Sequence, residues 1–350
     1  MSGVMRPVGR KLDLKNGRVD LTHGSGGRAM AQLIADIFHV AFDNEWLRRA
    51  DDQAVFDVPP GRLAMTTDGY VISPLFFPGG DIGSLAVHGT INDVAMSGAR
   101  PLKLTASFIL EEGFALADLK RIADSMGDAA RKADVPIVAG DTKVVERGKA
   151  DGVFISTAGL GVVPEGLTLS GNRAQPGDVV IVSGSMGDHG VAIMSCRENL
   201  QFDTDLLSDS AALHELTARM VATAAPSLRL MRDPTRGGLA ATLNEIAHQS
   251  DVGVRIAEGA IPVKPSVAAA CELLGLDPLY VANEGKLVAI VAPEAAQALL
   301  AAMRAHPLGA EAAIIGEIVA DQNRFVQMTT SFGGGRIVDW LSGEQLPRIC

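Results

Sequence analysis

Apolar patterns typical of strands and helices alternate along this chain in two blocks, and a segment rich in turn residues separates the blocks. The turns PEG, SGN and QPGD fall within residues 164–176. Neither block contains a βαβ succession regular enough for a doubly wound sheet. A chain of 350 residues is long enough to bury a core in each block. We therefore predict an α+β fold of two mixed α/β domains with a cleft between them.

The end of the chain has a different composition. Residues 331–350 read SFGGGRIVDWLSGEQLPRIC, so a run of glycines leads to a terminal cysteine, Cys350. Because glycine lacks the Cβ that restricts the backbone, such a tail can bend and carry its thiol into a cleft. The alternative is a frayed end that happens to finish in cysteine. We divide the chain into an N-terminal segment (1–40), a first domain (41–165), a second domain (166–330) and a flexible tail (331–350).

Composition excludes some classes of function. The net charge is −10 and no basic block offsets it, which argues against nucleic-acid binding. No stretch approaches twenty apolar residues and the first residues lack an apolar signal region, so we expect a cytoplasmic protein without a membrane span. The three cysteines show no C-x-x-C spacing, which disfavours a disulfide framework or a zinc site. Cys196 and Cys271 lie in apolar helical patterns and are predicted to fill cores.

A glycine-rich loop, LTHGSGGRA, precedes a helical pattern that starts near Met30. Its central residues are His23, Gly24, Ser25, Gly26 and Gly27. A loop of this kind exposes backbone N–H groups at a helix N-terminus, which suits a phosphate. It is not a Walker A loop, because the chain contains no G-x-x-x-x-G-K-[ST]. A helix-capping loop without a ligand is the alternative.

Several aspartates accompany predicted strands. Asp51 and Asp52 precede a predicted strand over 54–58, and Asp68 lies at the end of a second strand, LAMTTDGYVI. A third strand, over 135–139, runs into Gly140, Asp141, Thr142 and Lys143, which offer close backbone approach, a carboxylate, a hydroxyl and a cation. Carboxylate oxygens at strand ends are ligands that Mg²⁺ prefers. Turn formation is the alternative for each aspartate.

The segment 84–98, SLAVHGTINDVAMSG, has apolar residues at helical spacing. Asn92 and Asp93 flank that stripe, and polar side chains inside so apolar a helix need partners if they are buried. A metal-bound phosphate would supply such a partner. A solvated helix face would also explain both residues, and the sequence leaves the two readings open.

The second block contains two further candidate stretches. DPTRGG, residues 233–238, opens a predicted helix and places Arg236 at its positive end, where an anion is favoured. Residues 280–291, YVANEGKLVAIV, are predicted to form a hairpin with Asn283, Glu284 and Lys286 at its turn. Glu284 is then either a turn residue or a general base.

Together, several of these stretches resemble the HypE family of hydrogenase maturation proteins, in the PurM-like superfamily that includes aminoimidazole ribonucleotide synthetase. The matching stretches include LTHGSGG, TTDGYVISPLFFPGGDIG, GTINDVAMSGARP, ILEEGF, GDTKVVERGKADG, DPTRGGLA, NEGK and PRIC, and they span about residue 20 to residue 350. The terminal PRIC is the most specific of them. Selenophosphate synthetase is similar in fold but uses a reactive residue near its N-terminus, whereas the first cysteine here is Cys196.

The resemblance implies an ATP-dependent enzyme. Two PurM-like domains are expected, with an N-terminal ATP-binding domain that dimerises through a β-barrel. A HypF-type transferase would place a carbamoyl group on Cys350, and ATP would drive its dehydration to a thiocyanate. The cyanide would pass to an iron centre held by HypC and HypD, for the active site of a [NiFe] hydrogenase.

The resemblance also suggests roles for single residues. Residues matching the stretches that hold ATP and Mg²⁺ are His23, Gly24, Ser25, Gly26, Gly27, Asp68, Asn92, Asp93, Gly140, Asp141, Thr142 and Lys143. The predicted metal ligands are Asp52, Asp68, Asp93 and Asp141. Glu284 or Lys143 would accept the amide proton, Lys143 or Arg236 would steady phosphate oxygens, and Arg236 could guide the tail. The alternatives are another PurM-like enzyme acting on a free small molecule, such as a thiamine monophosphate kinase, and a scaffold whose thiol only docks a partner.

Overall fold

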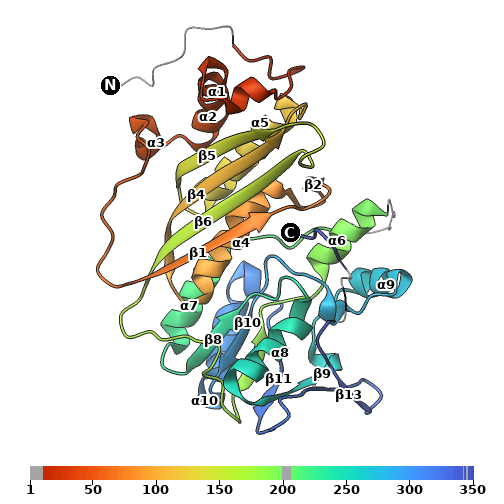
Figure 1. The fold of residues 1–350 in the computed structure, drawn as a ribbon. Coiled ribbons are helices and arrows are strands. Elements are labelled where there is room, and N and C mark those ends of the chain that lie inside the picture. Colours follow the sequence, from red (N-terminus) through yellow and green to blue (C-terminus); the bar gives the residue numbers. More distant parts are fainter. Residues whose placement is uncertain (1–10, 199–205, 342, 344–345) are drawn as a thin grey trace.

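A computed structural model describes residues 11–198, 206–341, 343 and 346–350 (Figure 1). The described chain forms two mixed domains, as the alternation of patterns predicts. The four-stranded sheet of the first domain has the order β1-β6-β4-β5, and the seven-stranded sheet of the second has the order β13-β12-β9-β11-β7-β10-β8. None of the helices in these residues is long and apolar enough to cross a membrane. The residue boundaries of the four-part division stay a prediction.

In the first domain, helices cover one face of the sheet. The strands are β1 (Arg62–Tyr70), β6 (Val153–Val163), β4 (Arg100–Glu111) and β5 (Ile137–Val145), with a short pair, β2 (Phe76–Phe77) and β3 (Gly80–Asp81), beside them. β4 and β5 are parallel because α5 (Leu116–Lys132) crosses between them, and the other neighbours are antiparallel. α5 and α4 (Ile82–Met96) pack behind the sheet in Figure 1. Short helices precede β1: η1 (Leu21–Gly24), α1 (Arg28–Leu33), η2 (Ile34–Phe38), α2 (His39–Phe42) and α3 (Glu45–Arg49).

The opposite face of this sheet keeps apolar side chains in solvent. Met65 is 77% exposed, Leu63 53% and Ile109 41%. Side chains alternate between faces along a strand, so these residues point away from the buried Leu104 and Phe108. In the described part of the chain, Trp46 and Phe56 reach this face at Lys103, but Leu63, Met65 and Ile109 stay exposed.

The central strands of the second sheet, β7 and β10, are buried on both faces. The strands of this sheet are β7 (Val179–Val182), β8 (Leu228–Arg232), β9 (Gly253–Ala257), β10 (Val288–Val291), β11 (Ala313–Val319), β12 (Val326–Thr329) and β13 (Gly335–Ile337). The helical elements are α6 (Asp188–Arg197), α7 (His214–Ala224), α8 (Gly238–Ser250), η3 (Glu258–Ala260), α9 (Pro265–Leu274), η4 (Pro278–Tyr280), α10 (Pro293–Arg304) and η5 (Pro307–Gly309). Val180 and Val182 pack with α8, whereas Ile181 packs with α7 and α10. Burial on both faces explains why β7 is an uninterrupted apolar run.

Four local predictions are wrong. Residues 54–58 form no strand; they are an irregular, partly exposed stretch between α3 and β1, where Phe56 packs against Trp46. Gly140 to Lys143 lie inside β5 rather than after it, since pairing with β4 continues to Val145. Residues 280–291 form no hairpin: η4 is followed by a loop and then by β10 alone. Cys196 is exposed, and only Cys271 of the two helical cysteines is buried.

Candidate active site between the two domains

Four carboxylates from both domains influence one another in the cleft. They are Asp68 of β1, Asp93 of α4, Asp233 after β8 and Glu284 before β10, and we call them the interdomain acidic cluster. Burial, followed by the charge of Asp93, raises the pKa of Asp233 to about 7. Burial, and then Asp233, raises the pKa of Glu284 well above its ordinary value. The cluster therefore collects like charges in a place where water screens them poorly.

The backbone at Glu284 is held by hydrogen bonds at both its carbonyl and its amide. Asn92 of α4 donates to the carbonyls of Glu284 and Ala211, both at 3.0 Å, and accepts from the amide of Leu213 at 2.7 Å. Asp209 accepts from the amide of Glu284 at 3.0 Å and pairs with Lys286 at 3.2 Å. The Oε1 atom of Glu284 is buried without a hydrogen-bond partner. The loop is thus fixed, while one carboxyl oxygen remains available to a ligand.

Asp93 lies where the cluster meets an open cavity. Its Oδ2 accepts a hydrogen bond of 2.8 Å from Thr66, and burial raises its pKa. A cavity of about 300 Å³ borders Asp93 and Asp233, with Arg232 and Ser170 among its other lining residues. This cavity gives a polar solute access to one side of the cluster.

The terminal cysteine lies in the same cleft. The amide of Val71 donates to the Cys350 carbonyl at 3.0 Å, and Ile349 is buried. Burial, and then the charge of Glu284, raises the pKa of the Cys350 thiol to about 12, while Arg236 opposes this shift. The structure therefore brings together Cys350, Glu284, Asp68 and Arg236, and it shows the predicted carrier tail in a docked position.

A second group of predicted residues, Asp141, Thr142 and Lys143, lies elsewhere, and we call it the β5 group. Lys143 Nζ lies 2.5 Å from Asp141, and this hydrogen bond is the main reason that the pKa of Asp141 is lowered. Asp68 of β1, Thr157 of β6, Ala106 of β4 and Gly140 of β5 lie opposite one another across the four strands. These four residues therefore share the helix-covered face of the sheet. The next residue along β5, Asp141, then points to the uncovered face, and so does Lys143. Within one chain, Lys143 and Glu284 are therefore on different sides of the sheet.

The glycine-rich loop contacts β5 rather than the interdomain acidic cluster. A Cβ on Gly24 would lie 2.8 Å from the nitrogen of Val144, and Gly26 has a φ of +77°. His23 is buried, and its Nδ1 accepts a hydrogen bond of 3.0 Å from the amide of Asp20 in a capping box. Asp51 and Asp52, in contrast, are exposed in the loop between α3 and β1.

The donor set suits a magnesium ion that arrives with phosphate. Among the residues described, no three His, Cys, Asp or Glu side chains converge closely enough to hold a metal alone. Mg²⁺ is usually bound by one or two carboxylates together with water and substrate phosphates. The raised pKa of Asp93 and Asp233 and the unpartnered oxygen of Glu284 fit such an ion.

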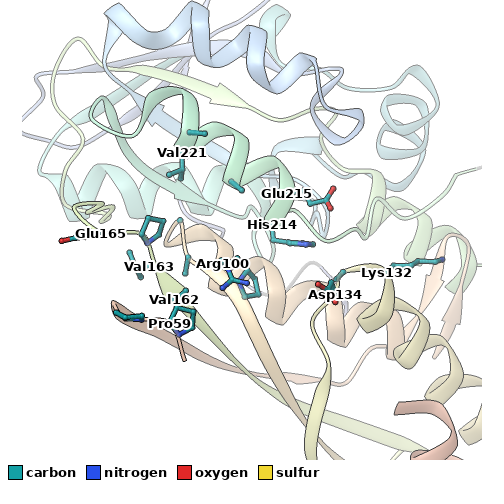
Figure 2. A pocket seen from close by; sticks show the side chains of 18 residues that line it. Pro59, Arg100, Lys132, Asp134, Val162, Val163, Glu165, His214, Glu215 and Val221 are labelled. Atoms are coloured by element: carbon teal, nitrogen blue, oxygen red, sulfur yellow. The ribbon is translucent and has the colours of Figure 1, made fainter. Parts of the chain in front are cut away.

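A cavity of about 660 Å³ lies apart from these residues (Figure 2). His214 and Glu215 of α7 face it from one side, and Lys132, Asp134 and Arg100 belong to the first domain. Most of its lining is apolar, and none of the predicted site residues contributes to it. Size alone therefore does not identify the active site here.

Sequence reasoning missed two residues of the cleft. Asp233 begins the DPTRGG motif, from which only Arg236 was selected, although an aspartate directly after a strand is the same signal that identified Asp68. Asp209 lies in a polar stretch without a recognisable pattern, and its role as the acceptor for Glu284 depends on tertiary structure.

Comparison with known proteins defines the class first. The models for the N-terminal and C-terminal domains of AIR synthase related proteins match residues 50–163 and 175–329. The two domains and their shared cleft thus define an AIR synthase related, PurM-like protein.

Closer relatives define the family. A carbamoyl dehydratase HypE from Rhizobium leguminosarum bv. viciae is 73% identical over 350 residues, with 100% of both chains covered. A crystal structure of hydrogenase maturation protein HypE in complex with ATP is 51% identical with a TM-score of 0.91, and the match covers 94% of this chain and 99% of that one. A HypE–HypF complex is 50% identical with a TM-score of 0.78, covering 88% and 99%. This chain belongs to the HypE family of hydrogenase maturation proteins, and the predicted family and fold class are confirmed.

Proposed function

We propose that this chain is an ATP-dependent carbamoyl dehydratase that converts a carbamoyl group on Cys350 into a thiocyanate. The cyanide then passes to an iron centre during maturation of a [NiFe] hydrogenase. The observation that carries the proposal is the docking of the terminal thiol beside Glu284 and the other carboxylates of the interdomain acidic cluster. Relatives at high identity over the full chain are named carbamoyl dehydratases.

The reaction removes the carbamoyl oxygen as phosphate. Hydroxide is a poor leaving group, so the amide oxygen first attacks the γ-phosphate of ATP and ADP leaves. The resulting S-bound iminophosphate loses its remaining nitrogen proton, the carbon–oxygen bond breaks, and phosphate departs. The products are the thiocyanate, ADP and phosphate. Positioning and charge neutralisation dominate the catalysis of such a transfer.

Glu284 is the proposed acceptor for one amide proton, and the departing phosphate takes the other. In the free protein, burial and neighbouring carboxylates favour its protonated form. Mg²⁺ bound with the nucleotide supplies positive charge, and Asp68, Asp93 and Asp233 are the proposed residues that hold it. Positive charge of this kind would offset the cluster, and Glu284 could then ionise and take a proton from nitrogen. The base is thus activated only when ATP is present.

Arg236 is proposed to stabilise anionic groups near the tail. It is exposed at the start of α8, and its charge acts on Cys350. A guanidinium placed there can hold phosphate oxygens as charge moves onto the departing phosphate. The predicted role of Arg236 as a guide for the tail is compatible with the same position.

The β5 group is proposed to act across a homodimer. Asp141 and Lys143 face the same uncovered side of the sheet as Leu63 and Met65. A second copy covering that side would bury these apolar side chains and bring the β5 group, with the glycine-rich loop, to the partner's nucleotide. This arrangement supports the predicted dimer through the first domain.

The proposed partners follow from what the docked thiol cannot do. A thiol whose pKa is about 12 is almost entirely protonated at neutral pH, and the thiolate is the nucleophile. We propose that Cys350 acquires its carbamoyl group away from the cleft, on a HypF-type transferase, because burial beside Glu284 disfavours the thiolate in the docked position. A relative has been crystallised in a HypE–HypF complex, which supports this step. HypC and HypD are the proposed acceptors of the cyanide.

The test follows the mass of the chain. We expect the carbamoylated protein to lose one water when Mg-ATP is added, with one phosphate released per chain. The Cys350→Ala variant should neither accept the group nor lose water, whereas Cys271→Ala serves as a matched control that does both. A thiocyanate adduct on the Cys350→Ala protein would overturn the carrier assignment. Phosphate release without loss of water would favour a free small-molecule substrate, and no release would favour a scaffold.

A further inference from the structure

Two side chains of α6 hold the docked tail by its backbone. Arg197 donates to the carbonyl of Pro347 at 2.6 Å and to the carbonyl of Arg348. Its Nε also donates to the carbonyl of Ser73 at 2.5 Å. One guanidinium thus joins the second domain, the first domain and the tail. Hydrogen bonds from a charged donor are stronger than neutral ones, so Arg197 is a substantial part of this contact.

His189 holds the next carbonyl of the tail. Its Nε2 lies 2.8 Å from the oxygen of Ile349, and its Nδ1 lies 2.8 Å from Oγ of Ser208. Because a carbonyl oxygen only accepts, Nε2 carries the hydrogen and donates it. Burial lowers the pKa of His189, so the ring is neutral and Nδ1 accepts from Ser208. Phe77 packs edge-on against this ring at 5.7 Å between centroids, which fixes its orientation.

The first domain holds the other side of the same peptide. The amides of Val71 and Ser73 donate to the carbonyls of Cys350 and Arg348 at 3.0 and 3.3 Å. Arg348 returns a hydrogen bond of 2.8 Å to the carbonyl of Val71. Ile349 is only 3% exposed, so an apolar anchor accompanies the polar contacts. All of these polar contacts fix the register of the backbone, and none of them involves the sulfur.

We propose that His189 and Arg197 form a latch for the C-terminal peptide, with Arg197 as the positioning residue that determines how often the tail leaves the cleft. The latch sets the distance of the sulfur from Glu284 through the backbone alone. It can therefore hold the free thiol, the carbamoylated thiol and the thiocyanate alike. Its importance for turnover rests on the proposed dehydratase function, but the docking itself does not.

The test measures how fast Cys350 reacts with iodoacetamide at pH 8 without ATP, by peptide mapping. A docked thiol with a pKa of about 12 reacts far more slowly than a free one, whose pKa is near 9.0, so the rate reports the fraction of open tail. We expect Arg197→Met to raise the rate about tenfold or more, because the variant loses charge-assisted bonds to two tail carbonyls. The rate of Cys350 alkylation in Arg197→Lys should lie between those of the wild type and Arg197→Met.

Controls distinguish specific release of the tail from general destabilisation of the second domain. Cys271 is buried within α9 and should keep its slow rate in every variant. Arg255→Met removes an exposed arginine of the same domain that pairs only with Glu317 in the described contacts, and it should leave Cys350 unchanged. His189→Gln keeps a donor and should disturb the tail less than His189→Leu. The proposal is overturned if Arg197→Met leaves the Cys350 rate unchanged or raises the Cys271 rate equally. If the alkylation rates change as expected but the carbamoylated wild-type protein loses no water with Mg-ATP, the result would instead count against the proposed function.

Discussion

The interdomain acidic cluster and the β5 group hold aspartates at neighbouring levels of one sheet, but in opposite physical settings. Asp68 faces the helices and the second domain, whereas Asp141 faces the uncovered side, three strands or about 14 Å away. In the cluster, burial and like charges raise the pKa of Asp93, Asp233 and Glu284. In the β5 group, Lys143 lowers the pKa of Asp141. The cluster thus needs a cation from outside, while the β5 group is already neutralised.

The sharpest way to break this comparison is to remove the charge of the base. Glu284→Gln keeps the shape of a buried side chain but cannot accept a proton, so we expect the rate of dehydration to fall about 10²–10⁴-fold. Loss of water from the carbamoylated chain, followed by intact mass, measures it. The matched control is Glu272→Gln, an exposed residue of α9, which should keep the wild-type rate. Dehydration at a normal rate by the Glu284→Gln protein would move the base to another residue.

The next experiment asks whether the two regions meet across a dimer. Lys143→Ala and Glu284→Gln should each be nearly inactive alone. If Lys143 serves the partner's cleft, an equal mixture forms dimers with one intact site, and about a quarter of the wild-type activity returns. The mixture should be prepared by unfolding and refolding together, with each variant treated alone as the control. Absence of recovery would place both residues in one site within one chain, or remove Lys143 from the reaction.

These two regions also show what the sequence could and could not predict. The apolar spacing of residues 84–98 is enough to predict α4, although the helix is buried on nearly all sides rather than along one stripe. Asn92 on that helix was predicted to bind the cofactor, yet its side chain bonds the carbonyl of Glu284, which lies 192 residues away. No local pattern records such a contact. In the same way, the sequence does not show whether an aspartate is neutralised by a lysine, as Asp141 is, or lies among buried carboxylates, as Asp233 does.

Predicting β5 failed for a related reason. Glycine and aspartate at Gly140 and Asp141 are typical of turns, so the strand was predicted to stop before them. In the structure, Gly140 lies directly opposite Ala106, where a Cβ would be 2.5 Å from the Ala106 oxygen. The glycine is therefore explained by close packing between strands rather than by a turn. The glycine-rich loop, the DPTRGG motif and the terminal cysteine could be selected from the sequence, but their separation into two regions required the sheet register.

A smaller effect tests the electrostatics of the cluster without any reaction. The pKa of Asp233 is about 7 in the folded protein and near 3.8 when unfolded, so the folded state binds the proton more tightly. The contribution of Asp233 to the stability of the wild type should then fall as pH rises from about 4 to about 7. Asp233→Asn lacks this loss and should be more stable by ~2–4 kcal/mol at pH 8, with little difference below pH 4. Urea unfolding at both pH values, in chelator and without ATP, measures it. Equal stability at pH 8 would mean that solvent already screens the cluster.

The smallest effect belongs to the β5 group and completes the comparison. Asp141 and Lys143 are both exposed, and solvent-exposed ion pairs contribute little to folding. Asp141→Asn should therefore change the free energy of unfolding by no more than about 0.5 kcal/mol, at pH 5 and pH 8 alike. Urea unfolding in about 0.05 M and about 1 M salt measures it. The difference in unfolding free energy between the wild type and Asp141→Asn should shrink at the higher concentration, because salt screens the charges. A change in stability as large as the one expected for Asp233→Asn would show that Asp141 is buried in the assembled protein. In that case, the uncovered face of the first sheet is closed by a second chain even without nucleotide.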